Sequence, residues 1–201
     1  MDWIEQRDSG VWLAEAVSYF RAFGFFESER HQPDEAVIAR VRAYYQHDWD
    51  DYMGTAPDRP SADQFLLIAD TSRVWFGDLE RVYHGAEAYA GSLREWAAIS
   101  REVFTPVQIA ETWHADEGPV EVTFVFRGVR HTFVHRDGHD DFIDLEIIHM
   151  INGLLTDTPY RFEACDNLGD CRFIVVLDCS EKARLKQERA WNFCDFLASE
   201  S

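Results

Sequence analysis

The chain has 201 residues, and 46% of them are hydrophobic, including 15 Phe, 7 Trp and 7 Tyr. This composition excludes a disordered polypeptide and is sufficient for one substantial core. The net charge is −18, from 19 Lys and Arg against 37 Asp and Glu. This charge disfavours nucleic acid as a partner and favours a basic protein. The alternative is that the charge only keeps the protein soluble.

The N-terminal part is predicted to form a layer of two helices over residues 1–60. Apolar residues recur at helical spacing from residue 11 to residue 27. A second helix is predicted to begin at Pro33, which suits the first helical position, and to reach Trp49. The stretch GTAPDRPSAD, residues 54–63, has the composition of a linker and separates this layer from the rest of the chain.

Residues 64–201 are predicted to form a body of strands and helices. Short runs with alternating or continuous apolar residues indicate strands, and longer runs with apolar residues at helical spacing indicate helices. In chain order, the predicted elements are a buried strand at 64–70, an extended segment at 72–85, a helix at 86–100, strands at 107–114, 120–126 and 129–135, a helix at 141–155, a hairpin of 160–165 with 171–179, and a helix at 180–198.

The order of these elements predicts the fold class. Helices and hairpins come in separate blocks and do not alternate strictly as strand, helix and strand. We therefore expect an α+β fold, with an antiparallel or mixed sheet covered by helices, in a single domain spanning residues 1–201. Neither G-x-G-x-x-G nor G-x-x-x-x-G-K-[ST] occurs in the sequence, and we expect no cofactor.

The sequence also predicts the compartment. The first ten residues, MDWIEQRDSG, lack the basic region and apolar run of a secretory signal, and no apolar stretch is long enough to span a bilayer. We therefore expect a cytoplasmic protein without a membrane partner, whose cysteines are thiols. Cys165 and Cys171 flank a short turn, so a pairing between them across a hairpin stays open, as does the oligomeric state.

The stretch HTFVHRDGHDDFIDLEIIH, residues 131–149, is dense in His and Asp, which are common metal ligands. A two-residue turn at Arg127-Gly128 fixes a register that places His131 and His135 on the apolar face of their hairpin. The preceding strand adds Glu111 to the same face. Because burial and mutual proximity perturb pKa values, these three residues are candidates for a catalytic or metal-dependent site.

The alternative is that this stretch is a strand, a turn and a capped helix. No spacing such as H-E-x-x-H occurs, and Asp140 or Asp141 suits the N-cap of the helix that follows. We favour this structural interpretation and expect no metal and no catalytic residue. A small hydrolase or metal-dependent enzyme that uses Glu111, His131 and His135 is kept as the alternative function.

The stretch YYQHDWDDYM, residues 44–53, combines aromatic and acidic side chains. Acidic residues at the C-terminal end of a helix are electrostatically unfavourable, so we predict that they serve something other than the helix. Trp and Tyr are frequent anchors of protein interfaces. The predicted partner-binding residues here are Asp48, Trp49, Asp50, Asp51 and Tyr52. The alternative is that Trp49 packs under the N-terminal layer and that the acids are only solvated.

Further acidic residues lie at the ends of the predicted strands. They would extend one negative surface toward a basic partner, because complementary potentials steer association. These predicted partner-binding residues are Asp116, Glu117, Asp137, Asp140 and Asp141.

Three segments together carry a resemblance to a class of known proteins. They are DLERVYHGAEAYAGSLREWAAISREVFTPVQIAETWHADEGPVEVTFVFRG, DFIDLEIIHMIN and FIVVLDCSEKARLKQERAW, which span residues 78–191. In order and composition they resemble the immunity proteins, small acidic cytoplasmic proteins of bacterial polymorphic-toxin systems. The resemblance implies a protein that binds and blocks a cognate basic toxin, and it carries over no catalytic residue. Residues 1–60 lie outside it.

Overall fold

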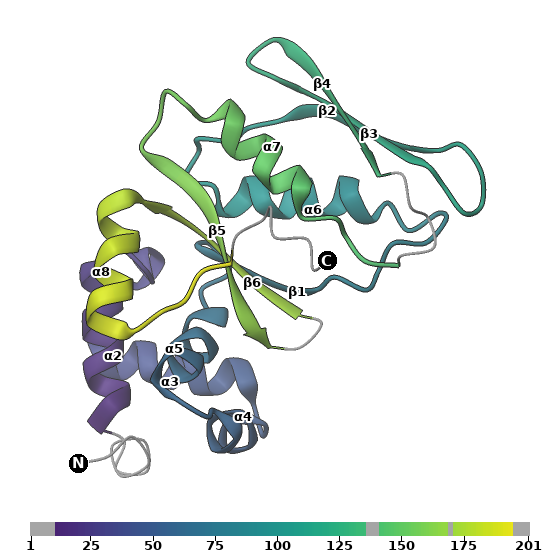
Figure 1. The fold of residues 1–201 in the computed structure, drawn as a ribbon. Helices are drawn as coiled ribbons and strands as arrows, with labels where there is room; N and C mark the ends of the chain where they lie inside the picture. Colours follow the sequence, from purple (N-terminus) through teal and green to yellow (C-terminus); the bar gives the residue numbers. More distant parts are fainter. Residues whose placement is uncertain (1–10, 136–140, 169–170, 195–201) are drawn as a thin grey trace. The chain divides into compact units, whose positions relative to one another are not determined.

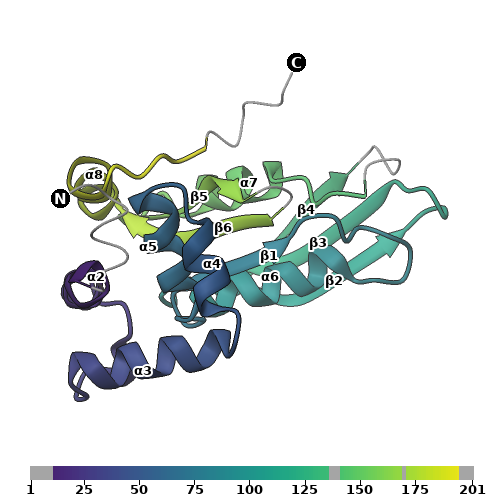
Figure 2. The same ribbon diagram turned by 90° about the horizontal axis from the view of Figure 1, so that it is seen from below.

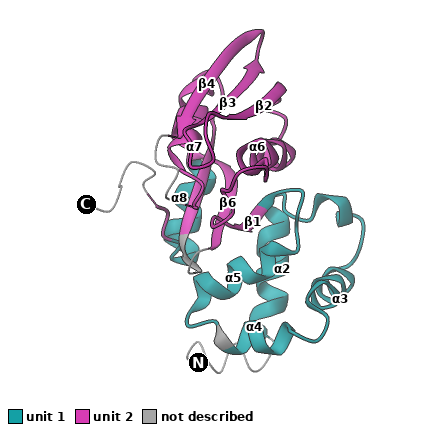
Figure 3. Ribbon diagram, turned by 90° about the vertical axis from the view of Figure 1, so that its right-hand side faces the viewer, with its two compact units in different colours: residues 1–74, 180–191 teal, residues 75–179, 192–201 magenta. Residues whose placement is uncertain are grey.

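A computed structural model describes residues 11–135, 141–168 and 171–194 (Figure 1). The chain forms two compact units, one made of Met1–Val74 and Ser180–Trp191 and the other of Trp75–Cys179 and Asn192–Ser201 (Figure 3). Helices and antiparallel hairpins occupy separate blocks of the chain, so the predicted α+β class is confirmed.

The first unit consists mainly of helices. They are α2 (Val11–Ala22), the short 3-10 helix η1 (Glu27–Glu29), α3 (Asp34–Tyr45), α4 (Trp49–Thr55), α5 (Arg59–Ile68) and α8 (Cys179–Arg189). The two predicted N-terminal helices are confirmed as α2 and α3. Helix α2 buries Trp12, Leu13, Val17 and Phe20, which recur at helical spacing. This unit is larger than the predicted layer over residues 1–60, because it also includes α5 and most of α8.

Helix α5 occupies the place of the predicted linker at 54–63 and the predicted strand at 64–70, so both predictions are wrong. Asp58 is the N-cap of this helix, and its Oδ1 accepts hydrogen bonds from Ser61 N at 2.9 Å and Ser61 Oγ at 2.7 Å. Residues 61–68 are all buried. The continuous apolar run of residues 65–68 is too short to distinguish a buried helix from a buried strand, and the start of the helix, with its Asp58 and Pro60, also has the composition of a linker.

The second unit contains two three-stranded sheets, with strand orders β1-β6-β5 and β2-β3-β4. Its elements are β1 (Val74–Asp78), α6 (Ala88–Ile99), β2 (Val107–Trp113), β3 (Val120–Phe126), β4 (Val129–His135), α7 (Glu146–Leu154), β5 (Tyr160–Leu168) and β6 (Cys171–Asp178). The predicted helix at 86–100 and all the strands predicted between residues 107 and 179 are confirmed. The segment predicted to be extended at 72–85 contains β1.

The predicted register of the β3–β4 hairpin is confirmed. Phe126 pairs with Val129, and from there Phe124 pairs with His131 and Val120 with His135. The connecting residues Arg127 and Gly128 have φ values of 51° and 79°, as a type I′ turn requires. The turn therefore sets the register, and the register sets which side chains share a face.

Strand β2 is irregular near its first residue. Its pairing with β3 is interrupted by a bulge between Val107 and Ala110, where Gln108 has a φ of 52°. Glu111 lies on the predicted face, together with Ile109 and Trp113, but Val107 is 56% exposed.

The core of the second unit joins both sheets to α6 and α7. Phe104 lies near its centre, with ring centroids 5.7 Å from Phe124 and 6.0 Å from Phe162. Figure 2 shows α6 running alongside the β2-β3-β4 sheet. Helix α6 buries Tyr89, Leu93 and Trp96 on one side. Within the described ranges, no helix has the length and apolar character needed to cross a bilayer.

Two helices of the second half are shorter than predicted. Helix α7 begins at Glu146 and not at Asp141, because residues 141–143 pair with residues 79–82 through Val82 N to Asp141 O and Ile143 N to Leu79 O. The predicted N-cap Asp141 is therefore wrong, and Asp140 lies outside the described residues. Helix α8 ends at Arg189, where Ala190 adopts a φ of 57°.

The register of the β5–β6 hairpin determines whether Cys165 and Cys171 lie opposite each other. The register pairs Cys165 with Phe173 and Leu168 with Cys171. Cys165 and Cys171 are therefore not opposite each other across the hairpin.

Candidate functional site

Glu111 is bound to the N-terminus of α6. Its Oε2 accepts a hydrogen bond from Ala90 N at 3.0 Å, and its Oε1 accepts one from Trp113 Nε1 at 2.9 Å. Ala90 lies in the first turn of α6, where free N–H groups and the helix dipole attract a carboxylate. Glu111 thus serves as a capping acid supplied from a neighbouring strand.

His131 and His135 both contact aromatic rings on the inner side of their sheet. The ring of His131 lies 5.5 Å from that of Phe124, and the ring of His135 lies 5.7 Å from that of Tyr89. His135 is only 5% exposed, and its Nδ1 lies 3.9 Å from Asp144 Oδ2. Burial alone would raise the pKa of Asp144, but this histidine and the backbone N–H of Glu146 together hold that pKa below its ordinary value.

Glu111, His131 and His135 share one face, as predicted, but they do not converge. The two histidines are four residues apart on β4, which corresponds to about 13 Å of strand. Glu111 is separated from β4 by the whole of β3, since it pairs with Val122, which in turn pairs with Phe133. Among the residues that the structure describes, no group of three or more His, Cys, Asp and Glu side chains is arranged to hold a metal ion.

The predicted partner-binding stretch at residues 48–52 forms the beginning of a separate helix. Helix α3 ends at Tyr45, and α4 starts at Trp49 with Asp48 as its N-cap. Asp50 and Asp51 therefore lie in the first turn of α4, where acids are electrostatically favourable. The premise that these acids sit at an unfavourable helix end is wrong, because the second helix does not extend to Trp49.

Aromatic rings gather around the buried side chain of Tyr45. Its hydroxyl donates to Phe65 O, and burial together with the neighbouring Tyr44 and Tyr52 raises its pKa. Ring centroids lie 5.2 Å from Tyr45 for both Tyr44 and Tyr52, and 5.5 Å for Trp49. Tyr44 is 48% exposed and Tyr52 41% exposed, while Trp49 is half-buried. Trp49 thus both packs against this cluster and borders the surface.

The carboxylates beside these rings have no described partner that neutralises their charge. Asp48, Asp50 and Asp51 are exposed, and their side chains make no hydrogen bond or ion pair with any residue that the structure describes. Together with Tyr44, Trp49 and Tyr52 they form a surface that we call the α4 acidic-aromatic surface. It offers negative charge next to ring faces, which suits a cationic side chain.

In the second unit, the chain around residues 82–84 lies between two of the predicted acids. Asp116 is almost fully exposed and its Oδ1 lies 3.5 Å from His84 Nδ1, while the backbone oxygen of Asp141 accepts from Val82 N at 2.7 Å. Glu117 and Asp141 are exposed as well. The predicted residues Asp137 and Asp140 lie outside the described residues.

The aromatic residues beside these acids of the second unit were not among the predicted partner-binding residues. Tyr83 is 63% exposed, and His84 packs on Trp113 with ring centroids 5.6 Å apart. The available signal was a tyrosine and a histidine in the polar stretch ERVYHG at the end of the predicted extended segment at 72–85. The second unit also carries more of the negative charge, with 21 Asp and Glu against 8 Lys and Arg, compared with 16 against 11 in the first unit.

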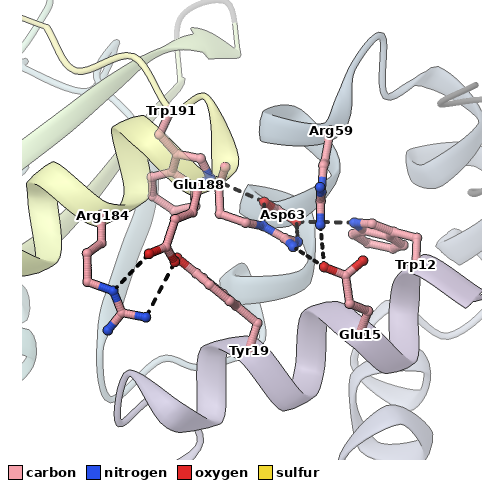
Figure 4. A network of polar contacts seen from close by, with 9 residues as sticks. Trp12, Glu15, Tyr19, Arg59, Asp63, Arg184, Glu188 and Trp191 are labelled. Carbon is pink, nitrogen blue, oxygen red and sulfur yellow. Dashed lines mark hydrogen bonds and ion pairs between the residues drawn. The ribbon is translucent and has the colours of Figure 1, made fainter.

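A buried polar network in the first unit was also missed (Figure 4). Asp63, which is fully buried, accepts hydrogen bonds from Arg189 Nε at 2.7 Å, Trp12 Nε1 at 3.2 Å and Trp191 Nε1 at 3.4 Å. Burial raises the pKa of Asp63, and the Arg189 guanidinium opposes that shift. Because both carboxylate oxygens accept hydrogen bonds, the network has a structural explanation: it joins α5 to α2 and α8.

Comparisons with family models, with curated proteins and with solved structures gave no match to this chain.

Proposed function

We propose that this chain is a binding protein that neutralises a basic protein toxin by covering it, as its resemblance to immunity proteins implies. The observation that carries this proposal is the α4 acidic-aromatic surface. There, three exposed carboxylates without a described partner border three aromatic side chains, Tyr44, Trp49 and Tyr52.

Such a surface fits lysine and arginine side chains of a partner. A cation over an aromatic ring contributes about 0.5 to 2 kcal/mol, depending on its desolvation, and Trp and Tyr are enriched among the residues that dominate binding. The net charge of −18 adds long-range attraction, which raises the rate of encounter with a basic protein. Inhibition by occlusion needs no catalytic group on this chain.

The residues around Tyr83 in the second unit are proposed as a further contact. Tyr83, His84, Asp116, Glu117 and Asp141 combine an exposed aromatic ring with exposed acids, as the α4 acidic-aromatic surface does. Each surface can be tested by itself.

The test begins with affinity capture from the source cells, using this protein as bait at low and then at high salt. The bait is compared with a variant that carries Asp48→Asn, Asp50→Asn and Asp51→Asn. A matched control carries Glu35→Gln, Glu80→Gln and Glu102→Gln, which remove the same charge at exposed carboxylates outside the surface.

We expect a basic protein that is retained by the wild-type chain and by the control but is retained at least about tenfold less by the triple Asp variant. This protein should arrest growth when expressed alone, and co-expression of the wild-type chain should restore growth. A captured protein that is harmless, or one that binds all three baits equally, would refute the proposal for this surface.

A further inference from the structure

The outer edge of β4 differs from the other sheet edges of the second unit. Sheet edges present unpaired N–H and C=O groups, and proteins usually shorten, bulge or cover them. The edge strands of the two sheets are β1 and β5 in one and β2 and β4 in the other. These four edges differ in whether their backbone groups are free to pair with another strand.

Three of the four edges are protected. On β5, the side chain of Asn152 bonds to both the N and the O of Phe162 at 2.8 Å and 2.9 Å, and Cys194 N donates to Ala164 O at 2.8 Å. Strand β1 is only five residues long. Strand β2 carries the bulge at Gln108, which interrupts regular pairing.

Among the residues that the structure describes, none protects β4 in any of these ways. It pairs with β3 over seven consecutive residues without a bulge, and it contains no proline and no lysine. Residues 129–134 make no hydrogen bond to any described residue outside the β3–β4 hairpin. Two of its side chains, Val129 at 57% and Val134 at 41%, are among the exposed large hydrophobic residues of the protein.

The turn determines which backbone groups of β4 point outward. In a two-residue hairpin the residues that flank the turn form a closely bonded pair, and bonded and non-bonded pairs then alternate. Val129, His131, Phe133 and His135 therefore bond to β3. The N–H and C=O groups of Arg130, Thr132 and Val134 point away from the sheet.

The outward N–H and C=O groups of one β4 strand can pair with the same groups of a second β4 strand. We propose that two copies of this chain pair through β4, antiparallel and centred on Thr132, so that the two sheets join into one. In this register Thr132 meets its own counterpart, Arg130 meets Val134 of the other copy, and all three outward residues form closely bonded pairs. His131 lies opposite Phe133 of the other copy, and no like charges are directly opposed.

The proposed dimer has a specific salt dependence. Two strands of this length bury less than the roughly 1,600 Å² of a standard interface, so we expect association only at protein concentrations of tens of micromolar or above. Each copy carries a net charge of −18, and screening of their repulsion should strengthen the dimer as salt is added. The toxin complex should weaken under the same change, so the two proposals can fail separately.

Sedimentation equilibrium at about 20 mM and 500 mM salt tests the proposal. We expect the mass to rise from 23.4 kDa toward twice that value with concentration, and more so at high salt. Thr132→Lys places like charges opposite each other at the centre of the pairing and should weaken association by up to about fivefold. Thr112→Lys is the matched control, because Thr112 is exposed on the opposite edge strand of the same sheet and should leave association unchanged.

A mixture of Thr132→Lys and Thr132→Asp chains should form a heterodimer, although each of these variants alone associates weakly. Circular dichroism of each variant checks that the fold is kept. A chain that stays monomeric at several hundred micromolar in high salt would overturn the proposal. So would a dimer that is indifferent to Thr132→Lys, since its interface would lie elsewhere.

Discussion

At the centre of the first unit lie a carboxylate and a guanidinium, Asp63 and Arg189, whereas the central cluster of the second unit is built from aromatic and aliphatic side chains around Phe104. The first arrangement fixes three helices that are far apart in sequence through directional bonds. The second joins two sheets and two helices through buried apolar area. One chain thus relies on two ways of assembling a core, and the two cores should respond differently to mutation.

The largest effect is expected for Asp63→Ala. It removes the buried carboxylate that pairs with Arg189 and leaves the exposed Glu15 as the other ion-pair partner of this guanidinium, and removing one partner of a buried pair costs about 3 to 5 kcal/mol. Urea unfolding measures the loss, and hydrogen exchange should show greater loss of protection in residues 11–74 than in residues 88–178. The double variant Asp63→Leu with Arg189→Met should recover most of the stability, because no charge is then left buried. A double variant as unstable as Asp63→Ala would show that the pair itself is indispensable.

The apolar cluster should offer no such rescue. Phe104→Ala leaves a cavity among Phe124, Phe126 and Phe162 and should cost about 3 to 4 kcal/mol in the free energy of unfolding. Phe104→Leu, which keeps most of the volume, should cost markedly less by the same unfolding measurement. Equal losses for the two variants would show that the ring contacts, and not the volume, determine stability here.

A smaller effect is expected at the start of α5, the helix that carries Asp63. Asp58→Ala removes the acceptor of the Ser61 N–H bond and should cost about 1 kcal/mol. Asp58→Ser should retain most of the stability, since Ser is also a good N-cap. Urea unfolding of both variants checks this prediction, and equal destabilisation would contradict the capping role.

The smallest effect is a pH dependence in the second unit. The folded-state pKa of Asp144 lies below its ordinary value of about 3.9, so this carboxyl contributes stability that is present above about pH 4 and lost as the pH falls through the folded-state pKa. The difference in the free energy of unfolding between wild type and Asp144→Asn should therefore shrink as the pH falls below about 4. A difference that grows on acidification would contradict the assigned direction.

The sequence predicted the second unit better than the first, for a physical reason. Alternating apolar residues and the Arg127-Gly128 turn determine both the strands and their register, so the shared face of Glu111, His131 and His135 was predictable. Helix α5 was not, because its short apolar run fits a buried strand as well as a helix, and its local start signals, the Asp58 cap and Pro60, also fit a linker. The Asp63 network joins residues 12, 63, 189 and 191, and no local pattern reports contacts over such separations.

The candidate site was predicted in part. The acids and aromatic residues of the stretch at 48–52 do reach the surface, but the break between α3 and α4 reverses the argument about the helix end. The burial of Tyr45 and the exposure of Tyr44 follow from how α3 packs in the unit. The difference between the β4 edge and the other sheet edges is a property of the folded structure.

The salt dependence of the affinity between the purified basic partner and this chain, measured by calorimetry, tests whether the α4 acidic-aromatic surface binds the toxin. The proposed function predicts that the wild type and the Glu35, Glu80 and Glu102 control bind alike, and that both weaken steeply as salt rises. It also predicts that the Asp48, Asp50 and Asp51 variant binds at least about tenfold more weakly at low salt. Equal affinity of the two triple variants would contradict the claim that the α4 acidic-aromatic surface binds the toxin.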